Sequence, residues 1–128
     1  MGNLTSNHVD WVASGHMGPV KDQGACGSCY AFSGLSALEA GIAIKTGQAP
    51  VRLSEQEWVD CSGSGGVDIF GTNYNNGGCM GGLEYFGWEY MRDHGGLTNA
   101  DYPYTAMDEA CKRTKDDPRV AVTDVTGW

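Results

Sequence analysis

Residues 26–45 read CGSCYAFSGLSALEAGIAIK, and this stretch decides the fold of the chain. Its larger apolar side chains recur at spacings of three, three and four, the repeat of one helical face. They are Phe32, Leu35, Leu38 and Ile42. Small residues on the neighbouring faces would let other backbone approach closely. These are Ala31, Gly34, Ala37 and Gly41. The pattern predicts a helix from about Ser28 to Lys45, with Cys29 at its mouth and Cys26 three residues earlier.

Two shorter helices are expected further along the chain. Ser54 and Glu57 form a capping box, in which the Ser54 hydroxyl accepts from the Glu57 amide while the Glu57 carboxylate reaches back. It opens a helix that runs to about Cys61. Another helix is expected from about Leu83 to His94, because its apolar residues share a face and a glycine pair follows it.

The rest of the chain is expected to be loop with one or two short strands. Residues 120–122, Val-Ala-Val, are the strand candidate. The glycine-rich segment from Ser62 to Gly78 is long for a loop, and loops of this length usually carry function or move. The sequence therefore predicts a mainly α protein with long loops.

Composition indicates one globular domain over residues 1–128. Twenty glycines and 41% hydrophobic residues suit a turn-rich globular protein. A net charge of −8 argues against nucleic acid or an anionic membrane as a partner. The chain has no run of about 18 apolar residues, so no membrane span is expected.

The cysteine count is odd, which leaves one thiol over if the others pair. The five are Cys26, Cys29, Cys61, Cys79 and Cys111. Four paired cysteines allow three connectivities and imply an oxidising compartment. The alternatives are five reduced cysteines in a cytosolic protein, or a redox motif at Cys26 and Cys29. A redox motif should follow a strand, whereas residues 18–25 read as turn and loop. A zinc site is disfavoured because no second Cys pair or His pair has ligand spacing, so no metal or cofactor is expected.

Several ordered motifs resemble the papain-like cysteine peptidases. The stretch around Cys29 matches the local signature of their nucleophile. The other matching segments are Val9-Asp10-Trp11, Pro19 to Gly24, Leu53 to Glu57 with Asp60-Cys61, Gly78 to Gly82, and Tyr102-Pro103-Tyr104. The resemblance implies the mostly helical left domain of that fold, with the β-rich right domain absent. In the family, the catalytic His and Asn follow about 130–150 residues after the nucleophile, which lies past Trp128.

By this resemblance, Cys29 is the nucleophile and the other cysteines form the pairs Cys26–Cys79 and Cys61–Cys111. Gln23, six residues before Cys29, would donate its side-chain amide to an oxyanion hole together with the Cys29 backbone N–H. Read alone, a Gln in a glycine-rich loop is a weak signal. Its offset within the matching motif is what carries the assignment.

The resemblance also implies a cleft for an extended peptide. Gly81 and Gly82 would let a substrate backbone pair with the chain, although glycine pairs are commonly turns. Leu83, with Glu84, would line the pocket for the second residue on the acyl side. Gly27 and Ser28 would edge the pocket for the residue being cleaved. The chain departs from the common family pattern at Tyr30, usually Trp, at Met80, usually polar, and in the length of the glycine-rich loop.

A helix N-terminus alone cannot make Cys29 an effective nucleophile. Its dipole favours an anion by about 0.3–1 kcal/mol, and up to about 2 when partly buried. An adjacent imidazolium must supply the rest. His8, His16 and His94 do not match the family position of the base, and we expect surface or capping roles for them.

We therefore expect a half-domain of a papain-like endopeptidase that is inactive alone. Its partners would be a peptide or protein substrate and a complementary right-domain chain, or a second copy of itself. We expect a lysosomal, vacuolar or secreted location. The alternative is a non-catalytic scaffold or assembly subunit derived from the same fold.

Overall fold

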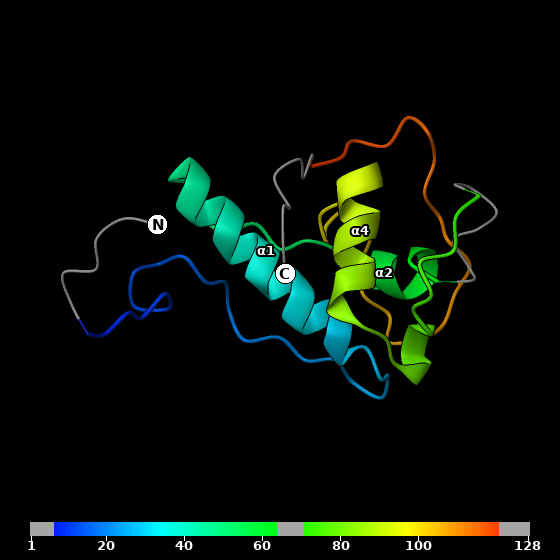
Figure 1. Cartoon of the computed structure of the whole chain (residues 1–128), viewed down its shortest axis with the longest axis horizontal. Coiled ribbons are helices and arrows are strands. Elements are labelled where there is room, and N and C mark those ends of the chain that lie inside the picture. Colours follow the sequence, from blue (N-terminus) through cyan, green and yellow to red (C-terminus); the bar gives the residue numbers. More distant parts are fainter. Residues whose placement is uncertain (1–6, 64–70, 121–128) are drawn as a thin grey trace.

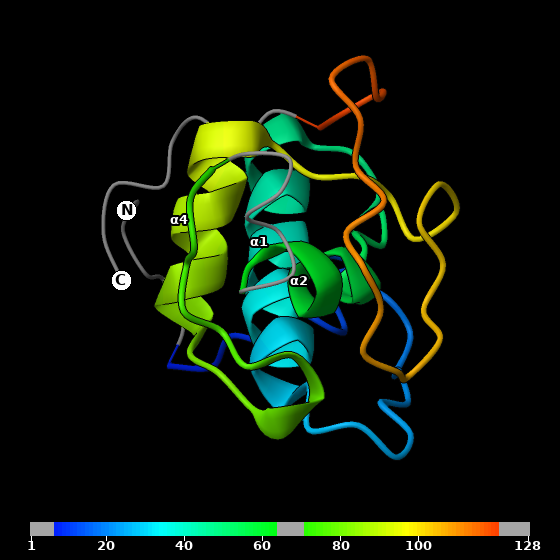
Figure 2. The ribbon, with the colours of Figure 1, turned by 90° about the vertical axis from the view of Figure 1, so that its right-hand side faces the viewer.

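A computed structural model of the chain describes residues 7–63 and 71–120. It contains helices α1 (Cys29–Thr46), α2 (Glu55–Cys61) and α4 (Glu84–His94), and a short 3-10 helix, η2 (Gly78–Met80). Helix α1 packs against both α4 and α2, and η2 packs against α2. Figure 1 shows α1 and α4 crossing at the centre of the molecule, and Figure 2 shows α2 lying in front of α1, with α4 to one side. The mainly helical prediction is confirmed.

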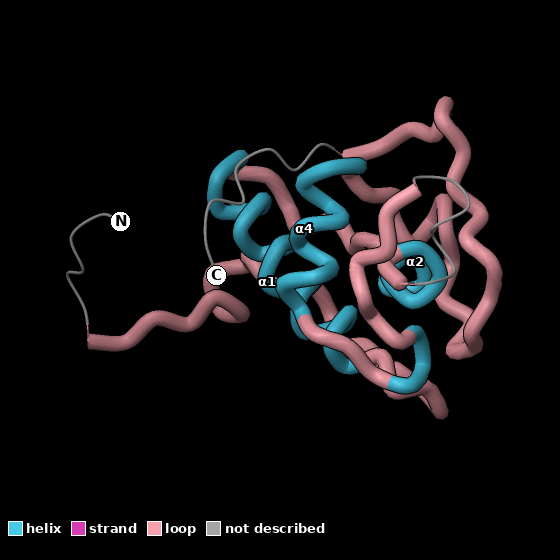
Figure 3. The backbone as a smooth tube through the Cα atoms, turned by 45° about the vertical axis from the view of Figure 1, so that its right-hand side comes forward, coloured by secondary structure: helices cyan, strands magenta, loops and turns pink. Residues whose placement is uncertain are grey.

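Long loops connect the helices, as Figure 3 shows. Within the described residues, β-type pairing is limited to isolated bridges: Leu53 with Thr98, Gly63 with Asn76, and Gly96 with Val120. The strand expected at residues 120–122 is thus represented by Val120 alone, and Ala121 and Val122 lie outside the described residues. None of the described helices is both long enough and apolar enough to cross a membrane.

The three helices begin and end within one residue of the predicted limits. Helix α1 has Ser28 as its N-cap and Gly47 as its C-cap, and Gly47 adopts the left-handed conformation (φ 69°) and donates its N–H to the carbonyl of Ala43. Such a cap satisfies a carbonyl that the helix end would leave unpaired, and glycine adopts it without a Cβ penalty.

The predicted capping box is half right. The Ser54 side chain accepts a hydrogen bond from the Glu57 amide at 3.0 Å. The expected return bond from Glu57 is wrong, because the Ser54 amide donates to the carbonyl of Leu97 instead. The Glu57 carboxylate is buried and accepts from the Leu97 amide, the Tyr90 hydroxyl and Arg113. A buried carboxylate needs a cation and several donors, and this requirement prevails over local capping.

Trp58 lies at the centre of the core and is fully buried. A Cβ added to Gly34 of α1 would lie 2.8 Å from its indole ring, and one added to Gly87 of α4 would lie 2.1 Å from it. One glycine in each helix therefore lets α1 and α4 pack closely against the Trp58 ring. The close approach expected at Gly41 is wrong: no atom of the described residues lies within 4 Å of a Cβ built there.

The predicted apolar stripe of α1 is only partly its buried face. Leu35 is fully buried, whereas Leu38 and Ile42 are partly buried against the core. The most buried positions of the helix include small residues and one acid, and they are Tyr30, Ala31, Gly34, Leu35, Glu39, Ala40 and Ala43. The helix packs closely because its small residues, more than its stripe of large ones, face the core.

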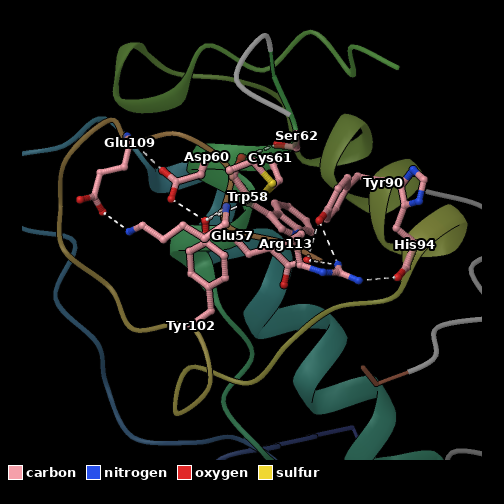
Figure 4. The surroundings of a disulfide bond; sticks show 12 residues. Glu57, Trp58, Asp60, Cys61, Ser62, Tyr90, His94, Tyr102, Glu109 and Arg113 are labelled. Carbon is pink, nitrogen blue, oxygen red and sulfur yellow. Dashed lines mark hydrogen bonds and ion pairs between the residues drawn. A yellow bond between two sulfur atoms is a disulfide. The ribbon is translucent and has the colours of Figure 1, made fainter. Parts of the chain in front are cut away.

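Every residue of α2 is buried, including its three acids. Figure 4 shows the groups that surround two of these acids, Glu57 and Asp60. Arg113 lies against Glu57, with its Nη1 2.6 Å from Oε2. Asp60 accepts from the Tyr102 hydroxyl at 2.7 Å. The segment that follows Leu97 therefore folds over α2 and supplies donors to Glu57 and Asp60, whereas Glu55 pairs with Lys21 and Arg52.

Candidate active site

Cys29 is the first residue of α1, and its thiol is free and exposed. Its neighbours Ser28 and Tyr30 are both buried. The Tyr30 hydroxyl donates to the Gly78 carbonyl at 2.8 Å, and burial raises the pKa of this phenol. Tyr30 therefore stays a hydrogen-bond donor that ties the start of α1 to η2, while Cys29 points to solvent.

The other four cysteines form two disulfides, in the pairing that the resemblance implies. Cys26 and Cys79 are joined at an S–S distance of 2.07 Å, and Cys61 and Cys111 at 2.05 Å. The first bond holds η2 beside the start of α1, where Gly27 also donates its N–H to the Cys79 carbonyl at 2.9 Å. A Cβ on Gly27 would lie 2.6 Å from that oxygen, so this approach requires glycine.

Gln23 is held in the loop that leads to Cys29. Its side-chain Nε2 donates to the Cys26 carbonyl at 2.9 Å, and its own carbonyl accepts from the Tyr104 hydroxyl. A carboxamide has two N–H donors, so this bond leaves one for another acceptor. The structure thus places a half-buried amide donor six residues before the thiol-bearing residue, anchored through both its side chain and its carbonyl.

The glycine-rich segment 81–83 has open faces. Gly82 and Leu83 are exposed, and Gly81 adopts φ 114°, which favours glycine. A Cβ on Gly82 would lie 2.3 Å from the Asn76 side-chain oxygen, so glycine is required there too. Glu84, expected beside a substrate pocket, has its carboxylate 2.8 Å from the Ser33 hydroxyl.

Asn76 holds this segment, and sequence analysis did not find it. Its buried side chain accepts from the Leu83 amide at 2.8 Å and donates to the Ser62 hydroxyl at 2.8 Å. The same carboxamide therefore fixes the start of α4 relative to the end of α2. A single Asn within a glycine-rich loop carries no sequence signal for such a contact.

The Ser28 side chain is fully buried, and its hydroxyl lies 2.8 Å from the Tyr104 hydroxyl. The neighbouring Gly27 is exposed. Of the two residues expected to edge the pocket for the cleaved residue, Gly27 therefore offers open backbone, whereas Ser28 turns its side chain inward.

The histidines have other partners. His16 Nδ1 lies 2.6 Å from the Ser14 hydroxyl, and His94 Nε2 lies 2.8 Å from the Tyr74 hydroxyl. Burial lowers the pKa of His94. Helix α4 begins beside the first turns of α1 (Figure 1), so its last residue, His94, is roughly 15 Å further along the helix axis. His94 is therefore not placed to serve Cys29, and the His16 ring is bonded to Ser14.

A hollow of about 360 Å³ lies along the loop before Cys29 and one side of α1. Its apolar lining includes Val12, Met17, Pro19, Val20 and Phe32, and Gln23 lies at the same surface. Within residues 7–63 and 71–120, no group of three or more His, Cys, Asp and Glu residues could hold a metal ion.

Comparison with known proteins agrees with this architecture. The family described as "Papain family cysteine protease" matches residues 5–127. A probable cysteine protease, RD21C, of Arabidopsis thaliana is 43% identical over 126 residues, which cover 97% of this chain and 25% of the relative. A cathepsin L-like proteinase of Phaedon cochleariae is 42% identical over 120 residues, covering 94% of this chain and 33% of the relative.

A solved structure gives the same result. The crystal structure of the Carica candamarcensis cysteine protease CMS1MS2 in complex with E-64 superposes with a TM-score of 0.75 at 33% identity. The match covers 90% of this chain and 49% of that one. The chain belongs to the papain family of cysteine proteases. It spans a quarter to a third of the length of the two curated relatives and about half of the solved chain.

Proposed function

We propose that this chain supplies the thiol nucleophile and the oxyanion hole of a papain-type cysteine endopeptidase, acting on peptides or proteins. The observation that carries the proposal is the exposed, uncrosslinked Cys29 at the first residue of α1, in a chain whose other four cysteines are bonded in pairs. Thiolates are the nucleophilic form, and a helix N-terminus favours negative charge.

In the proposed reaction, the Cys29 Sγ attacks the carbonyl carbon of the scissile peptide bond. The developing oxyanion accepts from the Cys29 backbone N–H and from the Gln23 Nε2 hydrogen not used by Cys26. An imidazolium then protonates the leaving amine, and water hydrolyses the thioester. None of His8, His16 and His94 matches the family position of that base, so we propose that residues 1–128 are one half of a catalytic domain and are inactive alone.

The open backbone at Gly81 and Gly82 supports the binding of an extended substrate beside Cys29. The Cys26–Cys79 bond holds this segment next to the start of α1. Leu83, with Glu84, would line the pocket for the second residue on the acyl side, and Gly27 and Ser28 would edge the pocket for the residue being cleaved. Ser28 would do so through its backbone, because its hydroxyl is occupied.

We propose that the missing imidazole comes from a right-domain half that packs on the hollow beside α1. The exposed apolar side chains there support binding of a protein partner. Because the match covers only 33% of the cathepsin L-like relative, a right-domain half is the partner that we propose. Self-association is the other outcome for this surface. The two disulfides support a lysosomal, vacuolar or secreted location.

The test joins this chain to the missing half. We would refold it, oxidised, with the part of the Phaedon cochleariae cathepsin L-like proteinase that follows the matched segment, and assay a fluorogenic peptide. We expect hydrolysis by the pair, none by either half, and none with Cys29→Ala. If the pair forms a stable complex that remains inactive, the enzyme proposal is wrong and a scaffold role is favoured.

Thiol counting provides a second, independent check. Iodoacetamide added without reductant should alkylate one cysteine per chain, and peptide mapping should place it at Cys29. Two alkylated residues, Cys26 and Cys29, would instead support the redox motif.

A further inference from the structure

The hydroxyl of Tyr104 lies between the two segments that carry the proposed oxyanion donors. It donates to the main-chain carbonyl of Gln23 and lies 2.8 Å from the Ser28 hydroxyl. A phenol has a single hydrogen. Since Tyr104 gives that hydrogen to Gln23, it accepts from Ser28, and the bonds run in one direction from Ser28 through Tyr104 to Gln23.

Tyr104 is itself held in place from two sides. Its ring packs edge-on against Phe32 of α1, with centroids 4.9 Å apart. The next residue, Thr105, donates its amide to the side-chain oxygen of Gln56 at 2.9 Å. Gln56 is fully buried in α2, and its Nε2 donates to Asp60 and to the carbonyl of Met107. Contacts with the core therefore fix the position of the Tyr104 hydroxyl.

Tyr104 also takes the Ser28 hydroxyl away from helix capping. Serine at an N-cap commonly accepts from an amide of the first turn. Ser28 is the N-cap of α1, yet its side chain makes no cap bond, and the Ala31 and Phe32 amides bond to its carbonyl instead. The amides that such a cap would bind, those of Tyr30 and Ala31, thus receive no hydrogen bond from the Ser28 hydroxyl.

We propose that Tyr104 is a positioning residue, which fixes the Gln23 loop against the start of α1 so that the Gln23 side-chain amide and the Cys29 N–H converge on one oxygen. The proposal rests on the proposed function. Tyr104 touches no reacting atom, and it acts through Gln23 and Ser28.

The first test is a double-mutant cycle in the assembled two-half enzyme. Removing one oxyanion-hole donor lowers kcat by about 100- to 1,000-fold. We expect Tyr104→Phe to lower kcat about 10-fold with KM changed less than about twofold, because the loss falls on transition-state stabilisation. In a Gln23→Ala background, Tyr104→Phe should cost less than about twofold more, since its effect passes through Gln23. An equal fall in both backgrounds, or no fall in either, would overturn the proposal.

Tyr102→Phe is the matched control. It removes a buried, bonded hydroxyl two residues away, whose partners include Asp60 and the Lys112 amide. A general loss of folding stability would appear in this variant too, whereas kcat should stay within about twofold of wild type at a temperature where both variants are folded. A fall in kcat matching that of Tyr104→Phe would contradict a specific positioning role.

The second test uses the 128-residue chain alone and does not require activity. In a ¹⁵N-labelled sample, the Gln23 side-chain amide should be ordered in wild type and in Tyr102→Phe, and more mobile in Tyr104→Phe. Unchanged order in Tyr104→Phe overturns the positioning proposal. If the order is lost as expected but the assembled wild-type enzyme is inactive, the positioning contact stands and the proposed function fails.

Discussion

At the scale of single residues, the core depends on two glycines that leave space for one buried indole ring. The indole ring of Trp58 lies against Gly34 of α1 and Gly87 of α4, and a methyl group at either position would overlap it. An indole cannot bend out of the way, and both sides of the ring are occupied. At these two positions packing therefore outweighs the cost of glycine in a helix, about 1 kcal/mol relative to alanine.

We predict that two Gly→Ala substitutions destabilise the fold and that a third stabilises it. Gly87→Ala should destabilise by about 3 kcal/mol and Gly34→Ala by about 1 kcal/mol, after the gain in helix propensity is subtracted. Gly41→Ala, in the same helix as Gly34 but facing open space, should stabilise by about 0.5–1 kcal/mol. Urea unfolding followed by circular dichroism measures all three. Equal stability of Gly34→Ala and Gly41→Ala would contradict this account of the core.

At the scale of elements, α2 is a buried helix whose polar side chains connect it to other segments of the chain. Two of its glutamates form ion pairs with different cations. Glu55 pairs with Lys21, and Glu57 pairs with Arg113. Lys21 also contacts Glu39 of α1, with an N–O distance of 2.8 Å. One ammonium group therefore joins α1 and α2 to the loop that carries Gln23. That loop is therefore anchored by charged groups on α1 and α2.

Sequence reasoning located these elements but not their partners. The bounds of α1, α2 and α4 follow from local signals such as glycine stops and the Ser54 cap, and local signals lie within a few residues. The direction of the Glu57 carboxylate depends on Arg113, and the position of Gln23 depends on Tyr104. Contacts between residues so far apart in the chain leave no periodicity or spacing to read.

We predict that Lys21→Met destabilises the chain in a pH-dependent way. At pH 7 the loss should be about 3 kcal/mol, since removing one partner leaves buried carboxylates uncompensated. Burial already raises the pKa of Glu39, which the Lys21 contact opposes, so losing Lys21 raises it further. A carboxyl with a raised folded pKa stabilises the fold below its unfolded pKa and loses this contribution as pH rises.

The loss in Lys21→Met should therefore be smaller at pH 4 than at pH 7. Urea unfolding at the two pH values measures it. Lys115→Met, at an exposed position, is the control and should change stability by less than about 0.5 kcal/mol at either pH. A penalty that stayed constant or grew on acidification would contradict the assigned charge state of Glu39.

At the scale of the whole molecule, the chain keeps apolar surface that its own core does not cover. Val20 is fully exposed and Val12 is 70% exposed, and both lie at the hollow beside α1. The motifs in the sequence indicated the family and the two disulfides, but not where this surface lies. Its location depends on how the loop before Cys29 runs along α1, which only the folded chain defines.

We predict that Val20→Glu weakens assembly with the right-domain half without unfolding this chain. A carboxylate at an apolar interface must be desolvated without a partner, which opposes binding. In the free chain the side chain is exposed, so the melting temperature should change little. Titration with the second half should show at least about 10-fold weaker binding for Val20→Glu.

Val51→Glu provides the matched control for this surface, because Val51 is 58% exposed and lies outside the hollow. It carries the same change of charge and size, so it should bind the second half as wild type does. Light scattering over a range of concentrations adds the test for self-association, which Val20→Glu should also reduce if two copies use this face. Equal binding by wild type and Val20→Glu, or equal weakening by both variants, would place the partner on another face of the molecule.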